Sequence, residues 1–325
     1  MNAREIIKET VFVIRSANER TEKLCVELIH EQLDLLTVKS DVQVIREVPF
    51  SKALKRSFEI GLDSRCRWLY SVDADILMRP GSIENMLLYA EKSKRNVSQL
   101  QSYMMDKFFG GVRRGGVHLY RGSLLDKVIR HIPEEGVDVR PETYLLNKMT
   151  RLGYPSQVVP YIIGTHDDEQ YYFDIYRKMF VQGFKHLNRA ELLINHWKKN
   201  VEKDSDFEVA LRAFSDSIVS GKKIYINRNL KIFRDNFKSL NVLEKPELIE
   251  NFITVQDVEN TIKNWHFSDL YNYYFPDKDG YDSASHKTIQ QLKRSVKKRG
   301  FFKTSLLSFS DLLLKTGRNL KSRVT

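Results

Sequence analysis

Strand-like and helix-like segments alternate through residues 1–95, and this alternation limits the fold more than any other feature. Residues 10–16, 41–48 and 67–73 are short apolar runs, and each precedes a stretch whose apolar side chains recur at helical spacing. Strands joined through helices usually run parallel in one sheet. The pattern therefore predicts an α/β fold with a mainly parallel sheet flanked by helices. In such sheets ligands bind beyond the carboxyl ends of the strands.

Two aspartates lie at one of these strand ends. Residues 68–87 read WLYSVDADILMRPGSIENML, which places Asp73 and Asp75 between an apolar run and a turn. Side chains two residues apart in an extended segment point to the same side, so both carboxylates can face one pocket if the strand continues through them. Two close carboxylates suit a hard divalent cation. Caps or turn residues would explain an isolated pair more simply, but the apolar flanks and the following helix favour a binding site.

The rest of the chain changes character twice. Residues 96–125 contain two glycine pairs and a strand-like VHLYR, and residues 141–152 read as a helix before a further strand, QVVPYII. From residue 170 onward the apolar spacing is largely helical. We expect an α/β domain over residues 1–185 and a helical region over residues 186–325. The last part of that region, about residues 291–325, is a basic amphipathic tail.

The net charge of +11 is concentrated in this tail. Residues 291–325 hold ten Lys or Arg and one acid, so the other 290 residues carry only +2. A nearly neutral body argues against a globally basic nucleic-acid-binding protein and favours a basic C-terminal extension. Cys25 and Cys66 are too few for a disulfide framework or a thiolate metal site, and we expect both to be reduced packing residues. We expect no signal peptide and no membrane span, and hence a cytoplasmic protein.

The segments that contain the aspartates resemble a known family. VFVIRSANERTEKL is similar to the first strand and turn of GT-A-fold glycosyltransferases, especially glycosyltransferase family 2. FSKALKRSFEIGLDSRCRWLYSVDAD resembles the helix and strand that deliver the D-x-D aspartates in that family. The resemblance covers about residues 8–185 and lies in order and spacing. It implies a GT-A (nucleotide-diphospho-sugar transferase, Rossmann-like) fold. It also implies transfer of a sugar, with inversion, from a nucleotide-sugar donor, by default a UDP-sugar.

The resemblance also implies which residues hold the nucleotide. The turn after the first strand carries Ser16, Asn18 and Glu19, which would lie near the base and the ribose. Basic side chains on the helix of residues 50–64 would face the nucleotide, and Lys52 and Arg56 are the residues that we assign there, with Lys55 beside them.

The same resemblance implies a Mn²⁺ or Mg²⁺ cofactor that holds the donor diphosphate. Asp75 would be its most direct ligand, with Asp73 beside it or acting through water on the metal and the nucleotide. His166 follows the strand-like VVPYIIG and fits a late metal ligand, although a strand-end histidine can also serve only as a hydrogen-bonding group. Asp167 and Asp168 are rival ligands because they offer hard oxygen atoms.

Inverting transfer requires a base that accepts the proton of the acceptor hydroxyl. By the resemblance, this carboxylate begins a helix after a glycine-containing loop, which makes Glu142 the first choice and Asp138 the reserve. The family usually has two acids here, whereas this chain has Pro141 and Glu142. Glu142 can alternatively serve only to complement the helix dipole.

The glycine-rich stretch FFGGVRRGGVHLYRG would form the wall for the donor sugar and the acceptor. Gly110 and Gly111 permit close approach of the backbone, and Arg113 or Arg114 could meet phosphate or an acidic acceptor. An ordinary flexible hairpin is the alternative interpretation.

The tail has features of a helix on an anionic membrane surface. Phe302, Leu306, Phe309 and Leu313 recur at helical spacing between basic clusters. Membrane contact would place the protein peripherally on the inner face of the membrane and would suit a lipid-linked or glycan acceptor. Alternatively, the tail is a helix packed on the domain.

Two other functions remain open. A sugar-phosphate nucleotidyltransferase is disfavoured because SANERTEK contains no glycine for a phosphate loop. A noncatalytic membrane or nucleic-acid adaptor would use the basic tail instead of the aspartates.

Overall fold

The computed structural model describes residues 2–138, 140–221, 224, 227, 229–249 and 252–264. All of them belong to one compact unit, Met1–Ser268. The basic tail at residues 291–325 and the membrane contact predicted for it lie outside the described residues. The predicted division at residue 185 stays a prediction.

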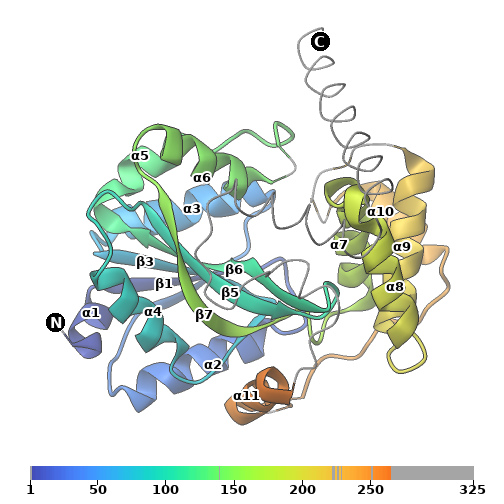
Figure 1. The fold of residues 1–325 in the computed structure, drawn as a ribbon, viewed down its shortest axis with the longest axis horizontal. Coiled ribbons are helices and arrows are strands. Elements are labelled where there is room, and N and C mark those ends of the chain that lie inside the picture. Colours follow the sequence, from blue (N-terminus) through green and yellow to red (C-terminus); the bar gives the residue numbers. More distant parts are fainter. Residues whose placement is uncertain are drawn as a thin grey trace, which may run out of the picture. The chain divides into compact units, whose positions relative to one another are not determined.

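The described residues form a seven-stranded sheet with the order β2-β1-β3-β6-β5-β7-β4 (Figure 1). Neighbours β2, β1 and β3 run parallel, as do β5 and β7, whereas the pairs β3–β6, β5–β6 and β4–β7 are antiparallel. The parallel order expected from the strand–helix alternation therefore holds for the first three strands, and the sheet as a whole is mixed. The strands are β1 (Thr10–Arg15), β2 (Val42–Ile45), β3 (Trp68–Asp73), β4 (Ile76–Met78), β5 (Gln99–Asp106), β6 (Gly111–Arg121) and β7 (Ser156–His166).

Helices cover both faces of the sheet. One face packs on a core with apolar side chains from α1, α2 and α4, and the other on a core with side chains from α3, α5 and α6 (Figure 1). Every residue of β1 is buried, as a strand covered on both faces requires. These helices are α1 (Ala3–Lys8), α2 (Glu22–Leu35), α3 (Phe50–Asp63), α4 (Ser82–Glu91), α5 (Leu125–Ile129) and α6 (Pro141–Arg151), with a short 3₁₀ turn at Gly122–Leu124.

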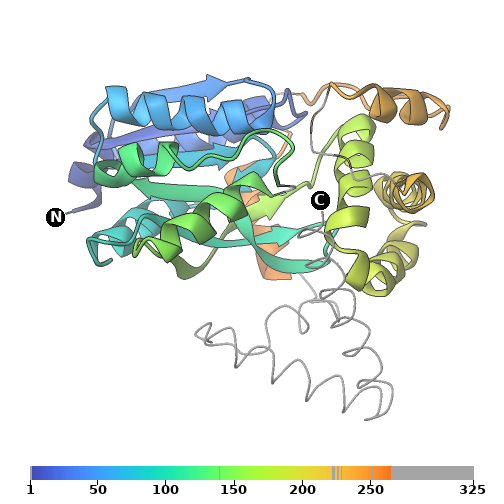
Figure 2. The same ribbon diagram turned by 90° about the horizontal axis from the view of Figure 1, so that it is seen from above.

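A second group of helices follows β7 (Figures 1 and 2). The turn between β5 and β6 is joined to this group, because Lys107 forms an ion pair of 2.6 Å with Asp206 and the Trp197 indole donates to the Phe108 carbonyl at 2.7 Å. The group contains α7 (Tyr172–Lys185), a 3₁₀ turn at Leu187–Arg189, α8 (Ala190–Asn200), α9 (Asp206–Ser220) and α10 (Lys231–Lys238).

The last described helix, α11 (Val255–Asn264), returns to the β4–β7 edge of the sheet. Arg79, directly after β4, donates to both carboxylate oxygens of Glu259 at 2.7 and 2.6 Å. Bidentate pairs of this kind fix position as well as charge. The α11 helix is therefore anchored beside the strand that begins next to Asp75.

Several expectations are confirmed by these elements. The strands and helices predicted through residue 93 are present within a few residues, and the α/β class is correct. Both cysteines are buried and free. Within the described residues, none of the helices is long and apolar enough to cross a membrane.

Candidate active site

Four strands that run in the same direction end in charged or ionisable residues, and their carboxyl ends together form one rim of the sheet. These last residues are Arg15 of β1, Asp73 of β3, Asp106 of β5 and His166 of β7. The pairing directions place the four carboxyl ends together, since β3 and β5 both run opposite to β6. This edge is where ligands bind in α/β sheets, as predicted from the strand order.

Asp73 and Asp75 face different partners. The strand does not continue through them, because β3 ends at Asp73 and a turn carries the chain to β4 on the far edge of the sheet. The condition for placing both carboxylates on one strand face is therefore not met, and a shared pocket stays a prediction. The carboxylate of Asp73 accepts from Arg15 at 2.9 Å, whereas Asp75 lies beside β7.

Asp75, His166 and Asp167 form a group with the composition of a metal site. One possible ligand atom from each lies within 4.8 Å of the others, and all three residues are buried. The register of β4 with β7 pairs Ile76 with His166, and the Asp167 amide donates to the Asp75 carbonyl at 3.2 Å. The structure thus brings together Asp75, His166 and Asp167, one of the two aspartates that were rival ligands to His166. The carboxylate of Asp168 is not part of this group.

A lysine lies between the two carboxylates of this group. The Lys178 ammonium on α7 is 2.5 Å from Asp75 Oδ2 and 2.5 Å from Asp167 Oδ1. Burial alone would raise the pKa of Asp75, but the charges of Lys178 and His166 hold it well below its ordinary value. Burial by itself lowers the pKa of His166, yet Asp167 and Asp75 raise it to about 10. The group is therefore a set of carboxylates balanced by cationic side chains.

A second layer of contacts fixes the His166 ring. Its Nδ1 atom is 2.8 Å from Asp106 Oδ2, and Arg113 on β6 also bonds to Asp106. Carboxylates behind a ligating histidine commonly set its tautomer and orientation. Arg113, predicted as part of the sugar wall, thus lies at the site and is paired with Asp106.

Glu142 belongs to a separate buried cluster at the same edge. It accepts from Arg15 at 3.0 Å and from the Tyr120 hydroxyl at 2.6 Å, and its second oxygen lies 2.8 Å from His118 Nε2. Burial alone would raise the pKa of Glu142, but the charge of Arg15 and these hydrogen bonds lower it. In this arrangement Arg15 forms ion pairs with both Glu142 and Asp73 and so connects the two carboxylates.

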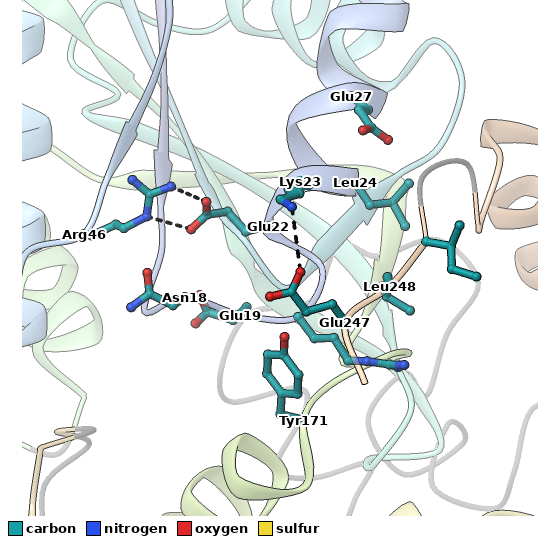
Figure 3. Close-up of a pocket in the computed structure, with 12 residues that line it drawn as sticks. Asn18, Glu19, Glu22, Lys23, Leu24, Glu27, Arg46, Tyr171, Glu247 and Leu248 are labelled. Atoms are coloured by element: carbon teal, nitrogen blue, oxygen red, sulfur yellow. Dashed lines mark hydrogen bonds and ion pairs between the residues drawn. The ribbon is translucent and has the colours of Figure 1, made fainter. Parts of the chain in front are cut away.

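The loop after β1 forms one wall of a cavity of about 390 Å³ (Figure 3). Within the loop, the Ser16 hydroxyl donates to Glu19 at 3.0 Å and the Asn18 amide donates to Ser16 at 2.8 Å. Burial and the nearby charge of Asp75 raise the pKa of Glu19 to about 7, despite the opposing charge of Lys178. The cavity therefore adjoins the Asp75 group. Its lining consists of Asn18, Glu19, Arg20, Glu22, Lys23, Leu24, Glu27, Arg46, Tyr171, Glu247, Leu248 and Ile249.

The remaining predicted residues lie farther from these contacts. Lys52 and Arg56 are exposed on α3, and the Arg56 guanidinium is 4.0 Å from Glu47. Arg114 is exposed on β6. Asp138 is partly buried and accepts from the Arg140 amide at 2.6 Å.

The glycine pair of the predicted wall forms the β5–β6 turn. Gly110 has a φ of 61°, and a Cβ atom there would lie 2.5 Å from the His196 ring. Gly111 is the first residue of β6 and is buried. The pair thus allows the turn to pack against α8, whereas a role beside the sugar stays a prediction.

Sequence reasoning missed several residues of the site. Lys178, Asp106 and Tyr171 belong to elements whose positions depend on tertiary packing, and nothing in their local pattern singles them out. A signal was present for Arg15, because an arginine inside an otherwise apolar, buried strand needs a buried partner.

The Asp75 group fits a divalent cation by its chemistry. Two carboxylates and an imidazole are ligands of Mn²⁺ and related ions. Among the described residues, Asp75 Oδ1 is a buried oxygen that has no hydrogen-bond partner. Such an atom is costly unless something binds it. Lys178 contacts Asp75 Oδ2 and Asp167 Oδ1, so a metal that bound these two oxygens would displace it.

No family model matches the sequence, and no curated protein matches it. Among solved structures, the chain is similar to a glycosyltransferase involved in glycosylation of the major capsid of PBCV-1 (13% identity, 49% of this chain, 82% of that chain, TM-score 0.34). It is also similar to the mannosyltransferase PcManGT from Pyrobaculum calidifontis in complex with GDP-Man and Mn²⁺ (10% identity, 72% of this chain, 79% of that chain, TM-score 0.39). A third similar structure is a nucleotide-diphospho-sugar transferase from Desulfovibrio desulfuricans G20 (12% identity, 66% of this chain, 98% of that chain, TM-score 0.35).

Proposed function

We propose that this protein is a metal-dependent glycosyltransferase that moves a sugar from a nucleotide-sugar donor to a glycan or lipid-linked acceptor. The observation that carries the proposal is the buried group of Asp75, His166 and Asp167 at the edge where four strands end. Its ligand atoms suit Mn²⁺ or Mg²⁺. When bound, the cation supplies Lewis-acid stabilisation of the charge on the departing nucleoside diphosphate.

The cavity beside the loop after β1 suits the nucleoside of the donor. Its volume of about 390 Å³ is within the range of small-molecule sites. Glu19 and Asn18 offer acceptors for ribose hydroxyls, and Tyr171 offers an aromatic face for a base. The carboxylates that line the cavity would repel phosphate. We therefore place the diphosphate toward the Asp75 group, where the proposed cation would bind it. A UDP-sugar remains the default donor.

Two carboxylates are proposed for the base that accepts the acceptor proton, and Glu142 is the first of them. Its lowered pKa and its partners Arg15, His118 and Tyr120 make it a weak base in the present arrangement. Asp138 is also partly buried and lies four residues before it. Inversion remains part of the proposal because either carboxylate would act on the acceptor.

The proposal is tested by thermal unfolding of the full chain with a panel of nucleoside diphosphates and nucleotide sugars, with and without Mn²⁺. A ligand at about 100 times its dissociation constant stabilises by about 2.7 kcal/mol. We expect stabilisation by one nucleotide class, dependent on Mn²⁺ and abolished in Asp75→Asn. The exposed Asp63→Asn on α3 is the matched control and should respond like the wild type.

Other results would redirect the proposal. If no member of the panel stabilises a folded wild-type protein, the adaptor hypothesis based on the basic tail becomes the better one. Stabilisation by a nucleoside triphosphate, with release of pyrophosphate from that triphosphate when a sugar phosphate is added, would identify a nucleotidyltransferase instead.

A further inference from the structure

Cationic side chains gather at the carboxyl end of α7, outside the Asp75 group. Arg177 and Lys185 are eight residues apart, so they lie on one face of this helix. The Arg140 guanidinium reaches the same end of α7, at 3.0 Å from the Lys185 carbonyl and 3.2 Å from His186 Nε2. The cluster therefore joins α7 to the segment that leads into α6.

Arg177 and Lys185 have few carboxylates beside them among the described residues. Arg177 is 4% exposed and its guanidinium lies 3.2 Å from Asp174, but its Nε atom has no hydrogen-bond partner among the described residues. Within the same residues, no carboxylate lies within ion-pair distance of the Lys185 ammonium. Burial and the charges of Arg140, Arg113 and Arg177 lower the pKa of Lys185 to about 7, against the opposite effect of Asp138. Arg177 is buried, Lys185 is half-buried and Arg140 is exposed, and neighbouring like charges repel one another unless an anion offsets them.

Helix geometry alone does not account for the cluster. The free carbonyls at a helix carboxyl end attract cations, and this explains the contact between Arg140 and the Lys185 carbonyl. That attraction is confined to the last turn of a helix, and Arg177 lies two turns earlier. Lys185 is at the correct end, yet burial and the neighbouring arginines lower its pKa.

We propose that Arg140, Arg177 and Lys185 bind an anionic group of the acceptor, either a phosphate or a carboxylate. Guanidinium groups match the oxygens of both anions, and a lysine adds a point charge. The acceptor is favoured over the donor because Arg140 lies between Asp138 and Glu142, the two residues proposed for the base. This inference rests on the proposed function, and it makes the acceptor an acidic glycan or a phosphate-linked sugar.

The test is thermal unfolding of the full chain with inorganic phosphate or free glucuronate, at constant ionic strength. We expect one of the two anions to raise the melting temperature of the wild type. In Lys185→Gln the unliganded protein should be more stable, because a repulsion between neighbouring cations is removed, and the anion should bind about tenfold more weakly. Lys185→Arg should keep the response. The exposed Lys148→Gln on α6 should match the wild type.

A second arm separates the acceptor from the donor. The anion is titrated again with Mg²⁺ and a saturating nucleoside diphosphate, and an additional stabilisation of unchanged size supports a separate acceptor site. Loss of the anion effect under these conditions would assign the cluster to the donor and overturn the inference. An anion effect that is equal in Lys185→Gln and the wild type, or absent from both, would overturn it as well. Failure of the proposed function would appear differently, as no response to any nucleotide while the anion response persists.

Discussion

Lys178 occupies the place between two carboxylates where a divalent cation is proposed to bind. Its ammonium contacts Asp75 and Asp167, and all three side chains are buried. Charge balance in the metal-free protein therefore depends on this lysine. A metal ion and Lys178 would compete for the carboxylates of Asp75 and Asp167. The free energy of unfolding should therefore depend on metal binding.

We predict that Lys178→Met lowers the free energy of unfolding by about 3 kcal/mol in EDTA, since it leaves two buried carboxylates without a counter-charge. Mn²⁺ should restore much of the loss, and should stabilise the variant more than the wild type. Urea unfolding with and without Mn²⁺ measures both effects. Lys198→Met, an exposed position on α8, is the control. If Mn²⁺ gave the variant no extra stability, the group would not be a cation site.

Glu142 links Arg15, at the end of β1, to His118 and Tyr120 on β6. We predict that Glu142→Gln lowers the free energy of unfolding by about 3 kcal/mol at neutral pH, because Arg15 loses one of its two carboxylates. The exposed Glu134→Gln should have little effect. Urea unfolding provides the comparison.

We also predict that the difference in unfolding free energy between the wild type and Glu142→Gln depends on pH. The pKa of Glu142 is lower in the folded than in the unfolded state, so its contribution is present above the unfolded pKa of about 4.5 and is lost as the pH falls below it. The difference in unfolding free energy between wild type and Glu142→Gln should be largest above pH 5 and should shrink in acid. A difference that stays constant down to acid pH would show that Glu142 is not held as a carboxylate by Arg15.

At the scale of single residues, the sequence predicted Asp75 and His166 because each follows a recognisable strand. It could not predict Lys178, which lies 103 residues from Asp75 in the chain and meets it only through the packing of α7. It also could not show that Asp73 turns toward Arg15, since that depends on where β3 ends.

At the scale of elements, the turn between β5 and β6 depends on Gly110. We predict that Gly110→Ala destabilises more than Gly153→Ala, although both glycines have positive φ. Nothing lies within 4 Å of the Cβ position at Gly153, so that variant carries only backbone strain of about 1–3 kcal/mol. At Gly110 the added methyl also meets His196, which adds a further loss of about 1–3 kcal/mol.

Hydrogen exchange of the β5–β6 amides and urea unfolding would measure the two glycine variants. Faster exchange of this hairpin in Gly110→Ala but not in Gly153→Ala is the expected pattern. Equal effects of the two substitutions would mean that the contact with α8 does not hold the hairpin.

The sequence predicted the elements up to α4 because each has a clear period and a clear boundary. The order of the later strands was not predictable. The β5–β6 hairpin inserts β6 beside β3, and β4 leaves β3 to pair with β7 at the far edge. Both arrangements are set by pairing between residues distant in the chain, which the local pattern does not encode.

At the scale of the whole molecule, the described helices after β7 are not an independent appendage. The α7 helix supplies Lys178 to the Asp75 group and Arg177 and Lys185 to the cationic cluster. The spacing of apolar residues predicted the helical character of this region, but not that it completes the site. The proposed donor and acceptor sites would thus both depend on the contact of α7 with the sheet.

The most direct test of the central claim is the binding of Mn²⁺ itself, followed by electron paramagnetic resonance of the free ion in the presence of the nucleoside diphosphate that stabilises best. The account predicts one Mn²⁺ bound per chain in the wild type and in Asp63→Asn, and at least tenfold weaker binding in Asp75→Asn, because a charged ligand is worth more than about 1.4 kcal/mol. Equal binding by Asp75→Asn and the wild type, or none by either, would contradict it.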